Sequence, residues 1–392
     1  MGPNGIDTTP MGSTVHEVAR RAGVASITVS RVLNGHASVS VETRRKVQTA
    51  MRDLDYVPNA LAQSLKGRST RTLGLVVGDV SNPFFTLLAR GLEDAATAAG
   101  YSVILCNSDD DPKKERAYLE ILARRRVDGL VLTPSQTDPE PVLEWARRSG
   151  PVCLVDRPVV GLDFRSAGID IVRGENLDSA ERLVAHLVQH GHRRIGIVNG
   201  PLALSTAVDR LTGYRRALAA AGIAVDERLE RAGRFSVESG RTQTAELLAH
   251  KRRPTALFAT NNLLALGGML AARDRELSIP GDLALVTFED IPDVAAVWPF
   301  ISVAAQAAAS MGQEAGRFIL ERIERQQKGA STESALQRTK TSTAKTRGEA
   351  KTRATPSTML KGRELVLATE LHLRRSCGCP SAASDSGMTW HP

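Results

Sequence analysis

The stretch AGVASITVSRVLN (residues 22–34) decides the fold of the first part of the chain. Gly23 interrupts one helical pattern, and a second follows in which apolar residues recur at helical spacing from Val24 to Val32. Two short helices joined by a glycine-containing turn form a helix-turn-helix. Small residues and one cation, Arg31, remain on the outer face, so the second helix can lie in the major groove of DNA. Spacing alone equally suits two helices packed in an ordinary core.

The flanking sequence favours DNA binding. Thr14 and Glu17 stand three residues apart ahead of the first helix, as in a capping box. A third helical pattern over residues 41–54 carries three consecutive cations and ends before Pro58, because proline cannot continue a helix. Residues 59–66 then form a two-turn helix that is marginal alone in water. This short helix needs a partner helix or DNA to fold.

Two segments, AGVASITVSRVLNG and VSVETRRKVQTAMRDLDYVPNALAQSLKGR, resemble the DNA-binding headpiece and hinge of the lactose repressor/galactose repressor (LacI/GalR) family of bacterial transcription regulators. The resemblance implies that Ser26, Ile27 and Arg31 read bases. It also implies that Leu65 wedges into the minor groove, as apolar side chains that kink DNA do. The other DNA-binding positions that the resemblance implies are Thr14, Thr28, Ser30, Asn34, Asn59, Ala62 and Arg68.

Length and charge agree with a regulator of two or three domains. The chain has 392 residues and a formal net charge of +8, and it is too long for one small domain. Residues 1–71 carry ten Lys and Arg against five Asp and Glu, and residues 329–363 carry eight against two. A basic headpiece implies phosphate contacts and strongly salt-dependent binding of double-stranded DNA.

Targeting signals and metal-ligand motifs are not evident. No run of about eighteen apolar residues occurs, and residues 1–10 have no apolar signal core. We therefore expect a cytoplasmic protein at the nucleoid, with no membrane partner. Four cysteines are too few for a disulfide framework in a cytosolic chain. Cys377 and Cys379 have only His372 near them in sequence, which falls short of a metal ligand set. No metal and no cofactor are predicted.

From Arg71 onward the pattern changes to alternating strands and helices. The continuous apolar run at residues 72–77 is typical of a buried parallel strand. A second series of the same kind follows after Asp170. Two doubly wound α/β lobes would leave a cleft at the carboxyl ends of their strands, where ligands bind. The expected fold is an all-α helix-turn-helix headpiece plus hinge helix, followed by an α/β two-lobed domain with doubly wound parallel sheets, like a periplasmic binding protein.

The predicted domain boundaries follow these pattern changes. They are a disordered N-terminal extension (1–13), the helix-turn-helix domain (14–58), the hinge helix and linker (59–71), the two-lobed effector-binding and dimerisation domain (72–379) and a tail (380–392). A disordered basic insertion is expected at 328–361, because it lacks the apolar periodicity needed to bury surface. Residues 364–373 return to a strand pattern that should complete the second lobe.

Polar and aromatic residues follow the predicted strands at the cleft. The resemblance implies polar anchors at Arg210, Asp156, Asn261 and Glu289, with Phe85 and Phe235 as apolar walls that cover a ring. The other expected effector-binding residues are Asn82, Phe84, Arg157, Thr206 and Gln306. Capping is the alternative role, because loop-end Asp, Asn and Arg cap helices very often.

Three departures from the family pattern bear on the effector. Asn262 and Glu289 stand where members usually have Asp, and Glu175 replaces Asp in a common Asp-Asn pair. Glutamate is one methylene longer than aspartate, so its carboxylate would lie deeper in the cleft. Either the effector is smaller or differently shaped, or this position no longer binds it.

The sequence thus favours a transcriptional repressor that binds a near-palindromic operator as a homodimer. A small effector, sugar-like or nucleobase-like, would control it from the cleft. Two alternatives are the same regulator under a protein corepressor, and a two-lobed solute-binding protein without a regulatory role. An enzyme is not expected, because nucleophile-elbow, phosphate-loop, dinucleotide and zinc-protease motifs are missing from the sequence.

Overall fold

The computed structural model describes residues 13–33, 38–56, 69–135, 137–291, 300–343 and 360–379. The chain divides into two compact units, Met1–Thr70 and Arg71–Pro392. Within the described residues, no helix is both long and apolar enough to cross a membrane.

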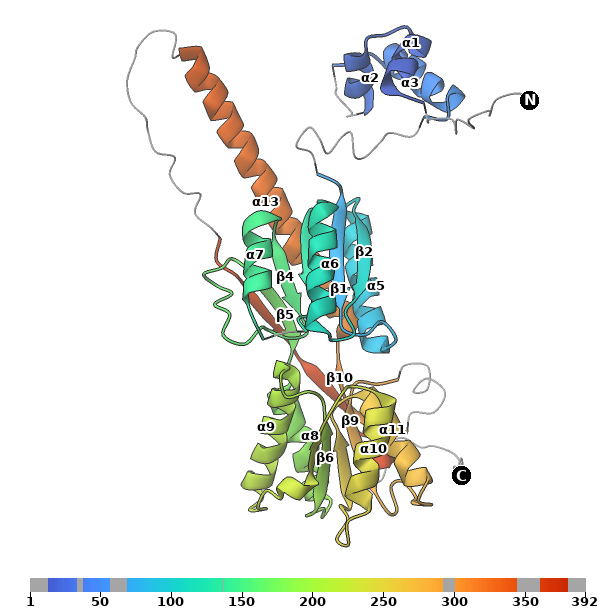
Figure 1. Ribbon diagram of the computed structural model, residues 1–392, viewed down its shortest axis with the longest axis vertical. Helices are drawn as coiled ribbons and strands as arrows, with labels where there is room; N and C mark the ends of the chain where they lie inside the picture. The colour runs from blue at the N-terminus through green and yellow to red at the C-terminus, as the bar shows by residue number, and fades with distance from the viewer. Residues whose placement is uncertain are drawn as a thin grey trace, which may run out of the picture. The chain divides into compact units, whose positions relative to one another are not determined.

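The described residues of the first unit form three helices (Figure 1). They are α1 (Val15–Ala22), α2 (Ser26–Leu33) and α3 (Val41–Asp53). The predicted capping box is confirmed: the Thr14 backbone N–H donates to the Glu17 carboxylate at 2.7 Å, and the Glu17 N–H donates to the Thr14 hydroxyl at 3.3 Å. Gly23 ends α1 with a left-handed φ of 66°, which glycine adopts without steric cost.

One valine from each helix forms the centre of the headpiece core. Val18, Val29 and Val47 are fully buried. On α2 the packed face is Val29 and Val32, three residues apart, while Val24 ahead of the helix is only half-buried. The opposite face of α2 therefore stays exposed.

The first lobe is a parallel six-stranded sheet between helices. Its strand order is β11-β5-β4-β3-β1-β2. The strands are β1 (Thr72–Val77), β2 (Ser102–Asn107), β3 (Gly129–Leu132), β4 (Val152–Val155), β5 (Asp170–Gly174) and β11 (Glu364–Leu367). The helices are α5 (Pro83–Ala98), α6 (Pro112–Arg124), α7 (Glu140–Arg148) and α13 (Ala308–Thr343). Leu73 and Leu75 of β1 are fully buried, as the apolar run predicted.

The second lobe repeats this plan with the order β12-β10-β9-β8-β6-β7. Its strands are β6 (Ile195–Asn199), β7 (Glu230–Ala232), β8 (Ala256–Ala259), β9 (Ala284–Phe288), β10 (Ser302–Gln306) and β12 (Thr369–His372), of which β12 is antiparallel to β10. Its α-helices are α8 (Leu177–Gln189), α9 (Ser205–Ala220), α10 (Val237–Leu248) and α11 (Asn262–Arg273), with 3-10 turns η1 (Glu227–Leu229) and η3 (Arg375–Cys377). Two doubly wound lobes are thus present in one unit, as predicted (Figure 1).

The predicted single strand at residues 364–373 is wrong, because it divides between the lobes. β11 pairs with β5 of the first sheet, and β12 pairs with β10 of the second. Each half completes the hydrogen bonding of a strand that would otherwise be an open edge. The chain therefore crosses between the lobes three times, after β5, after β10 and after β11.

Part of the predicted insertion is also helical. α13 continues to Thr343, so residues 328–343 extend a helix that begins at Ala308. The expectation of disorder for these residues is therefore corrected. Adding residues to an existing helix avoids the cost of nucleation, and Ala, Gln, Glu, Lys and Arg have good helix propensity. Residues 344–359, the tail and the N-terminal extension before Ser13 lie outside the described residues.

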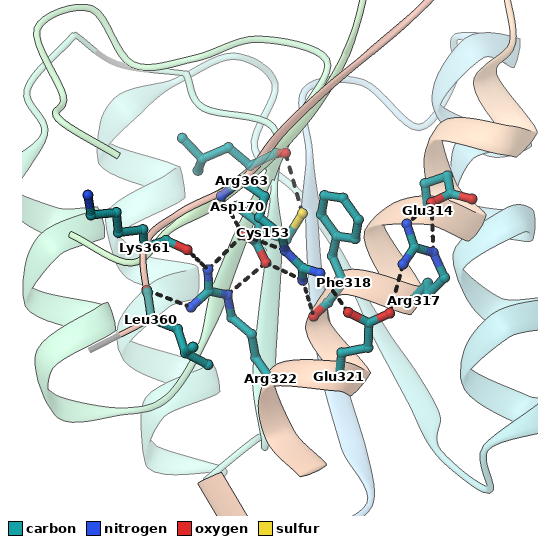
Figure 2. Close-up of polar contacts among 11 residues, drawn as sticks. Cys153, Asp170, Glu314, Arg317, Phe318, Glu321, Arg322, Leu360, Lys361 and Arg363 are labelled. Atoms are coloured by element: carbon teal, nitrogen blue, oxygen red, sulfur yellow. Dashed lines mark hydrogen bonds and ion pairs between the residues drawn. The ribbon is translucent and has the colours of Figure 1, made fainter. Parts of the chain in front are cut away.

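A buried carboxylate holds both flanks of this insertion in the first lobe. Asp170, at the start of β5, accepts hydrogen bonds from Arg322 Nε of α13 at 2.7 Å and from the Arg363 backbone N–H at 2.8 Å (Figure 2). Arg322 also donates to the carbonyl oxygens of Leu360 at 3.2 Å and Lys361 at 2.9 Å. This set of contacts, here called the Asp170 clasp, brings the two flanks together.

Candidate DNA-binding surface and effector cleft

The exposed face of α2 carries an apolar tip and a cation. Ile27 is 59% exposed, and Arg31 is exposed one helical turn later. Side chains four residues apart lie on the same side of a helix. Ser26, Thr28 and Ser30 are half-buried. Ile27 and Arg31 are therefore the two side chains of this group that protrude most from the headpiece.

The other predicted DNA contacts divide into two groups. Thr14 forms the capping box, which holds the start of α1. Five predicted contacts lie outside the described residues, and they are Asn34, Asn59, Ala62, Leu65 and Arg68. The predicted hinge helix at residues 59–66 also lies outside the described residues, and of the linker that follows it only residues 69–71 are described.

All eleven predicted effector residues line a single cavity of about 40 Å³ in the second unit. From the first lobe and its loops come Asn82, Phe84, Phe85, Asp156 and Arg157, and from the second come Thr206, Arg210, Phe235, Asn261, Glu289 and Gln306. Two further residues line it, Asp79 and Asp110, and sequence reasoning missed both. They follow β1 and β2 at the same sheet edge, so the strand-end rule would have found them. Ligand contact by these residues stays a prediction.

Two of the carboxyl groups, one from each lobe, stand at equivalent positions after a strand. Asp156 follows β4 with φ of 72°, and Glu289 follows β9 with φ of 64°. The Asp156 N–H donates to Val172 O and the Glu289 N–H donates to Ala304 O, both at 3.0 Å. Left-handed backbone is uncommon for residues other than glycine, and such strain gathers at functional sites. The two residues therefore leave their strands in the same backbone conformation.

Arg210 supplies a buried positive charge that interacts with both carboxyl groups. Its Nε donates to Asn176 Oδ1 at 2.9 Å, and a terminal nitrogen donates to Thr260 O at 2.6 Å. Its guanidinium carbon lies 4.1 Å from the centre of the Phe288 ring. Burial lowers the pKa of Arg210, while Asp156 and Glu289 act in the opposite direction. The second lobe thus holds this cation in one orientation.

Burial raises the pKa of both carboxyl groups. It raises the pKa of Glu289 to about 8, against the opposing charge of Arg210 and the hydrogen bond from Gln306. Burial also raises the pKa of Asp156, with Arg157 and Arg210 opposing. Gln306 Nε2 donates to Glu289 at 2.5 Å, whereas Gln306 Oε1 is buried and has no hydrogen-bond partner among the described residues. The cavity therefore offers both donors and acceptors to a polar ligand.

Aromatic rings from both lobes border these polar groups. Phe84 and Phe85 lie in the first turn of α5, with ring centres 5.1 Å apart in an edge-to-face arrangement. On the other side Phe235 covers Gly200, where an added Cβ would lie 2.1 Å from Phe235 Cζ. Glycine at position 200 thus sets the position of the Phe235 ring.

Two of the predicted effector-binding residues also cap helices. The side-chain oxygens of Asn82 and Asn261 accept hydrogen bonds from the first turns of α5 and α11. The unusual Asn262 has a separate role, because its Nδ2 donates to Asn82 Oδ1 of the opposite lobe at 3.1 Å and to Asp290 O at 3.2 Å. An ionised aspartate at position 262 could not donate these bonds. This departure therefore ties the lobes together.

A helix-turn-helix unit and a two-lobed binding domain in one chain define a DNA-binding regulator with a ligand-sensing domain. Family models agree with both parts. Residues 14–59 match the bacterial regulatory proteins of the lacI family, and residues 70–347 match the periplasmic binding proteins and sugar binding domain of the LacI family.

Known proteins of similar sequence and structure support the same assignment. The regulator DegA of Bacillus subtilis (strain 168) is 35% identical over 312 residues, which is 78% of this chain and 90% of DegA. The lac repressor dimer bound to operator and the anti-inducer ONPF matches with a TM-score of 0.74 and 26% identity, covering 94% of this chain and 99% of that one. The regulator CelR in complex with cellobiose matches with a TM-score of 0.63 and 29% identity, covering 93% and 99%.

The chain belongs to the LacI family of bacterial regulatory proteins. It is a DNA-binding transcription regulator and not an enzyme.

Proposed function

We propose that this regulator is a repressor that binds a near-palindromic operator as a homodimer in the cytoplasm. A polar effector, sugar-like or nucleobase-like, controls it from the interlobe cleft. The observation that carries the proposal is the convergence of side chains from both lobes on one cavity, in a chain that also holds a helix-turn-helix. The complexes of lac repressor with operator and of CelR with cellobiose, both similar to this chain, support it.

The exposed Ile27 and Arg31 of α2 are suited to contacting base edges in the major groove. Ile27 can contact a thymine methyl group, and Arg31 can donate to guanine or to a phosphate. Arg31→Met should weaken binding to the operator by about 10- to 100-fold, as the loss of one such contact does. The exposed Arg216 of α9 provides a matched control, and Arg216→Met should bind DNA as the wild type does.

The operator can be sought by footprinting the promoter region next to the protein's own gene. Twofold symmetry predicts a discrete protected palindrome at moderate salt, and its absence would overturn specific binding. Fluorescence anisotropy with this site and with random DNA then separates specific from non-specific affinity. Leu65→Ala should weaken operator binding far more than binding to random DNA. Equal losses on both would exclude a wedge at Leu65.

The size of the cavity ties effector entry to movement of the lobes. About 40 Å³ is room for roughly three or four waters, since each needs on the order of 10–15 Å³. A ring-sized effector therefore requires the lobes to separate, and their three chain crossings allow this. Lobe movement can alter the spacing of the two hinge segments in a dimer. Because the hinge helix is marginal, operator affinity follows by linkage.

A thermal-shift screen of sugars, polyols and nucleobases tests effector control. A compound that binds the folded protein should raise its melting temperature with concentration. Phe235→Ala should abolish that shift, whereas Phe164→Ala, which alters a half-buried ring in the first-lobe core, should preserve it. The same compound should change operator affinity. If nothing in the screen shifts the melting temperature, small-molecule control is wrong for these classes.

An exposed apolar edge of the first lobe supports the homodimer. Leu105 is 47% exposed on β2, the last strand of the first sheet, and Leu87 is exposed on the neighbouring helix α5. Apolar side chains at an open sheet edge favour pairing with a second copy. Leu105→Asp should convert dimer to monomer in sedimentation velocity, and Val225→Asp, at an exposed apolar site of the other lobe, should not. A monomeric wild type contradicts the homodimer.

A further inference from the structure

Two thiols and an imidazole lie together in the second lobe, where η3 meets α8. His186 of α8, Cys377 of η3 and Cys379 each offer one ligand atom, and these atoms all lie within 4.8 Å of one another. His186 Nε2 lies 3.2 Å from Cys377 Sγ, and the two sulfurs are 2.8 Å apart. His186 is 191 residues from Cys377, which is why sequence spacing did not reveal the cluster. His372, the nearest histidine in sequence, instead lies 3.6 Å from Glu370.

We propose that His186, Cys377 and Cys379 form a binding site for one Zn²⁺ ion. Thiolate and imidazole are the ligands that select zinc, whereas Mg²⁺ and Ca²⁺ prefer oxygen. Tetrahedral zinc has bonds of about 2.3 Å to sulfur and about 2.0–2.1 Å to nitrogen. The sulfurs need to separate by about 1 Å to reach this geometry. Cys379 and His186 are half-buried, so water can take the fourth position.

The backbone at the two cysteines is already arranged for chelation. Gly378 between them has a left-handed φ of 82°, and its N–H donates to Arg375 O at 3.0 Å. This turn puts both sulfurs on the same side, where each lies within 3.4 Å of Arg374 O. Only His186 and the separation of the sulfurs must adjust. Pre-arranged ligands lower the conformational cost of binding an ion.

The segment that carries the cysteines is held firmly against the second sheet. The Ser376 hydroxyl donates to Leu285 O at 2.6 Å and accepts from the Ser302 N–H at 2.8 Å. Arg374 donates to both carboxylate oxygens of Asp290, at 3.0 and 2.5 Å. Asp290 is the residue after Glu289 in the cleft. Zinc would therefore join α8 to a segment that contacts the effector site through Arg374.

The test is a metal titration of the reduced full-length protein. Co²⁺ should give a thiolate-to-cobalt charge-transfer band and tetrahedral visible bands that saturate at one equivalent. Zn²⁺ should displace the Co²⁺ spectrum, and Mg²⁺ should not. Competition with a chromogenic zinc chelator then measures affinity. Saturation at one equivalent supports the site, and a reduced protein that shows no charge-transfer band overturns it.

Matched variants assign the ligands. Cys379→Ser and His186→Gln should each lose more affinity than the roughly 10- to 100-fold caused by removing an outer hydrogen-bond partner of a ligand. His190→Gln, one turn along the same helix, and Cys106→Ser in the first lobe should bind as the wild type does. If His186→Gln binds zinc as tightly as the wild type, the three-residue site is wrong.

Alkylation of the wild type provides a second measurement that does not depend on how the variants fold. Zn²⁺ should protect Cys377 and Cys379 from iodoacetamide, as read by peptide mass spectrometry, and a chelator should restore their reaction. Equal alkylation with and without Zn²⁺ overturns the proposal. So does a protein that takes up no ion and forms a Cys377–Cys379 disulfide under mild oxidation.

Discussion

Asp170 in the first lobe and Glu289 at the cleft are both buried carboxyl groups, with 0% and 8% of their surface exposed. Burial would raise the pKa of Asp170, but hydrogen bonds from Arg322 and Arg363 hold it below its ordinary value. Burial raises the pKa of Glu289 to about 8, because Arg210 and Gln306 compensate only part of its desolvation. Two carboxyl groups that are similarly buried thus have pKa values shifted in opposite directions.

The difference separates a carboxylate that stabilises the fold from one that is suited to a ligand. The Asp170 clasp compensates its charge fully with two guanidinium groups of the same chain. In the cleft, Glu289 has one hydrogen-bond donor at 2.5 Å, and the buried Gln306 Oε1 next to it has no partner within the described part of the chain. Unsatisfied polar groups at a cavity are what a polar ligand can satisfy.

The largest expected effect is at the clasp. Asp170→Asn removes the charge that compensates buried Arg322, and breaking a buried pair in this way costs about 3–5 kcal/mol of the free energy of unfolding. Urea denaturation measures this loss, read from the unfolding transition of the second unit. Asp94→Asn, at an exposed position of α5, is the control and should change stability by less than about 0.5 kcal/mol. If Asp170→Asn lowers the free energy of unfolding as little as Asp94→Asn does, the Asp170 clasp does not stabilise the fold and its contrast with Glu289 is wrong.

Whereas Asp170→Asn should lower the free energy of unfolding, Glu289→Gln should raise it relative to wild type, and by an amount that depends on pH. The folded pKa of Glu289, about 8, lies above its ordinary value of 4.5, so the folded state keeps a proton that the unfolded state releases. Stability from this proton is present below pH 4.5 and is lost as pH rises toward 8. Gln keeps the neutral form throughout.

The unfolding free energy of Glu289→Gln, relative to wild type, should therefore rise between pH 5 and 8. The rise cannot exceed about 1.4 kcal/mol per pH unit. Urea unfolding at several pH values measures it, with Glu120→Gln, at an exposed position of α6, as control. A relative stability that stays constant over this range would show that Glu289 is ionised in the folded protein, as Asp170 is, because a carboxylate ionised in both states contributes no pH dependence there.

The smallest effect concerns packing at the cleft rather than charge. Gly200→Ala places a Cβ where it meets the Phe235 ring at 2.1 Å, and overpacking of this kind costs about 1–3 kcal/mol. The displaced ring should also reduce the melting-temperature shift produced by any effector. Gly222→Ala, where a Cβ meets nothing within 4 Å, has a strained φ of 67° but leaves Phe235 in place. An effector shift that is equal in both variants would remove Phe235 from the binding site.

Sequence patterns predicted the separate elements well because those patterns act over a few residues. The Thr14–Glu17 capping box, the buried strand at β1 and the strand-end position of Asp156 all follow from local spacing. Strand ends together with the family resemblance gave eleven of the residues that line the cavity, and missed Asp79 and Asp110. Failure came at residues 364–373, where one continuous strand pattern serves two sheets.

The sequence by itself determined the helix-turn-helix, the alternating strands and helices, and the polar residues at strand ends. Their signals are periodicity, capping and turn chemistry, which depend on near neighbours. Only the tertiary structure decided which distant groups meet. It placed Asn262 on Asn82 across the lobes, Arg322 and Arg363 on Asp170, and His186 beside two cysteines. Such contacts join residues far apart in the chain, and they exist only because the lobes and their three crossings fix where each segment returns.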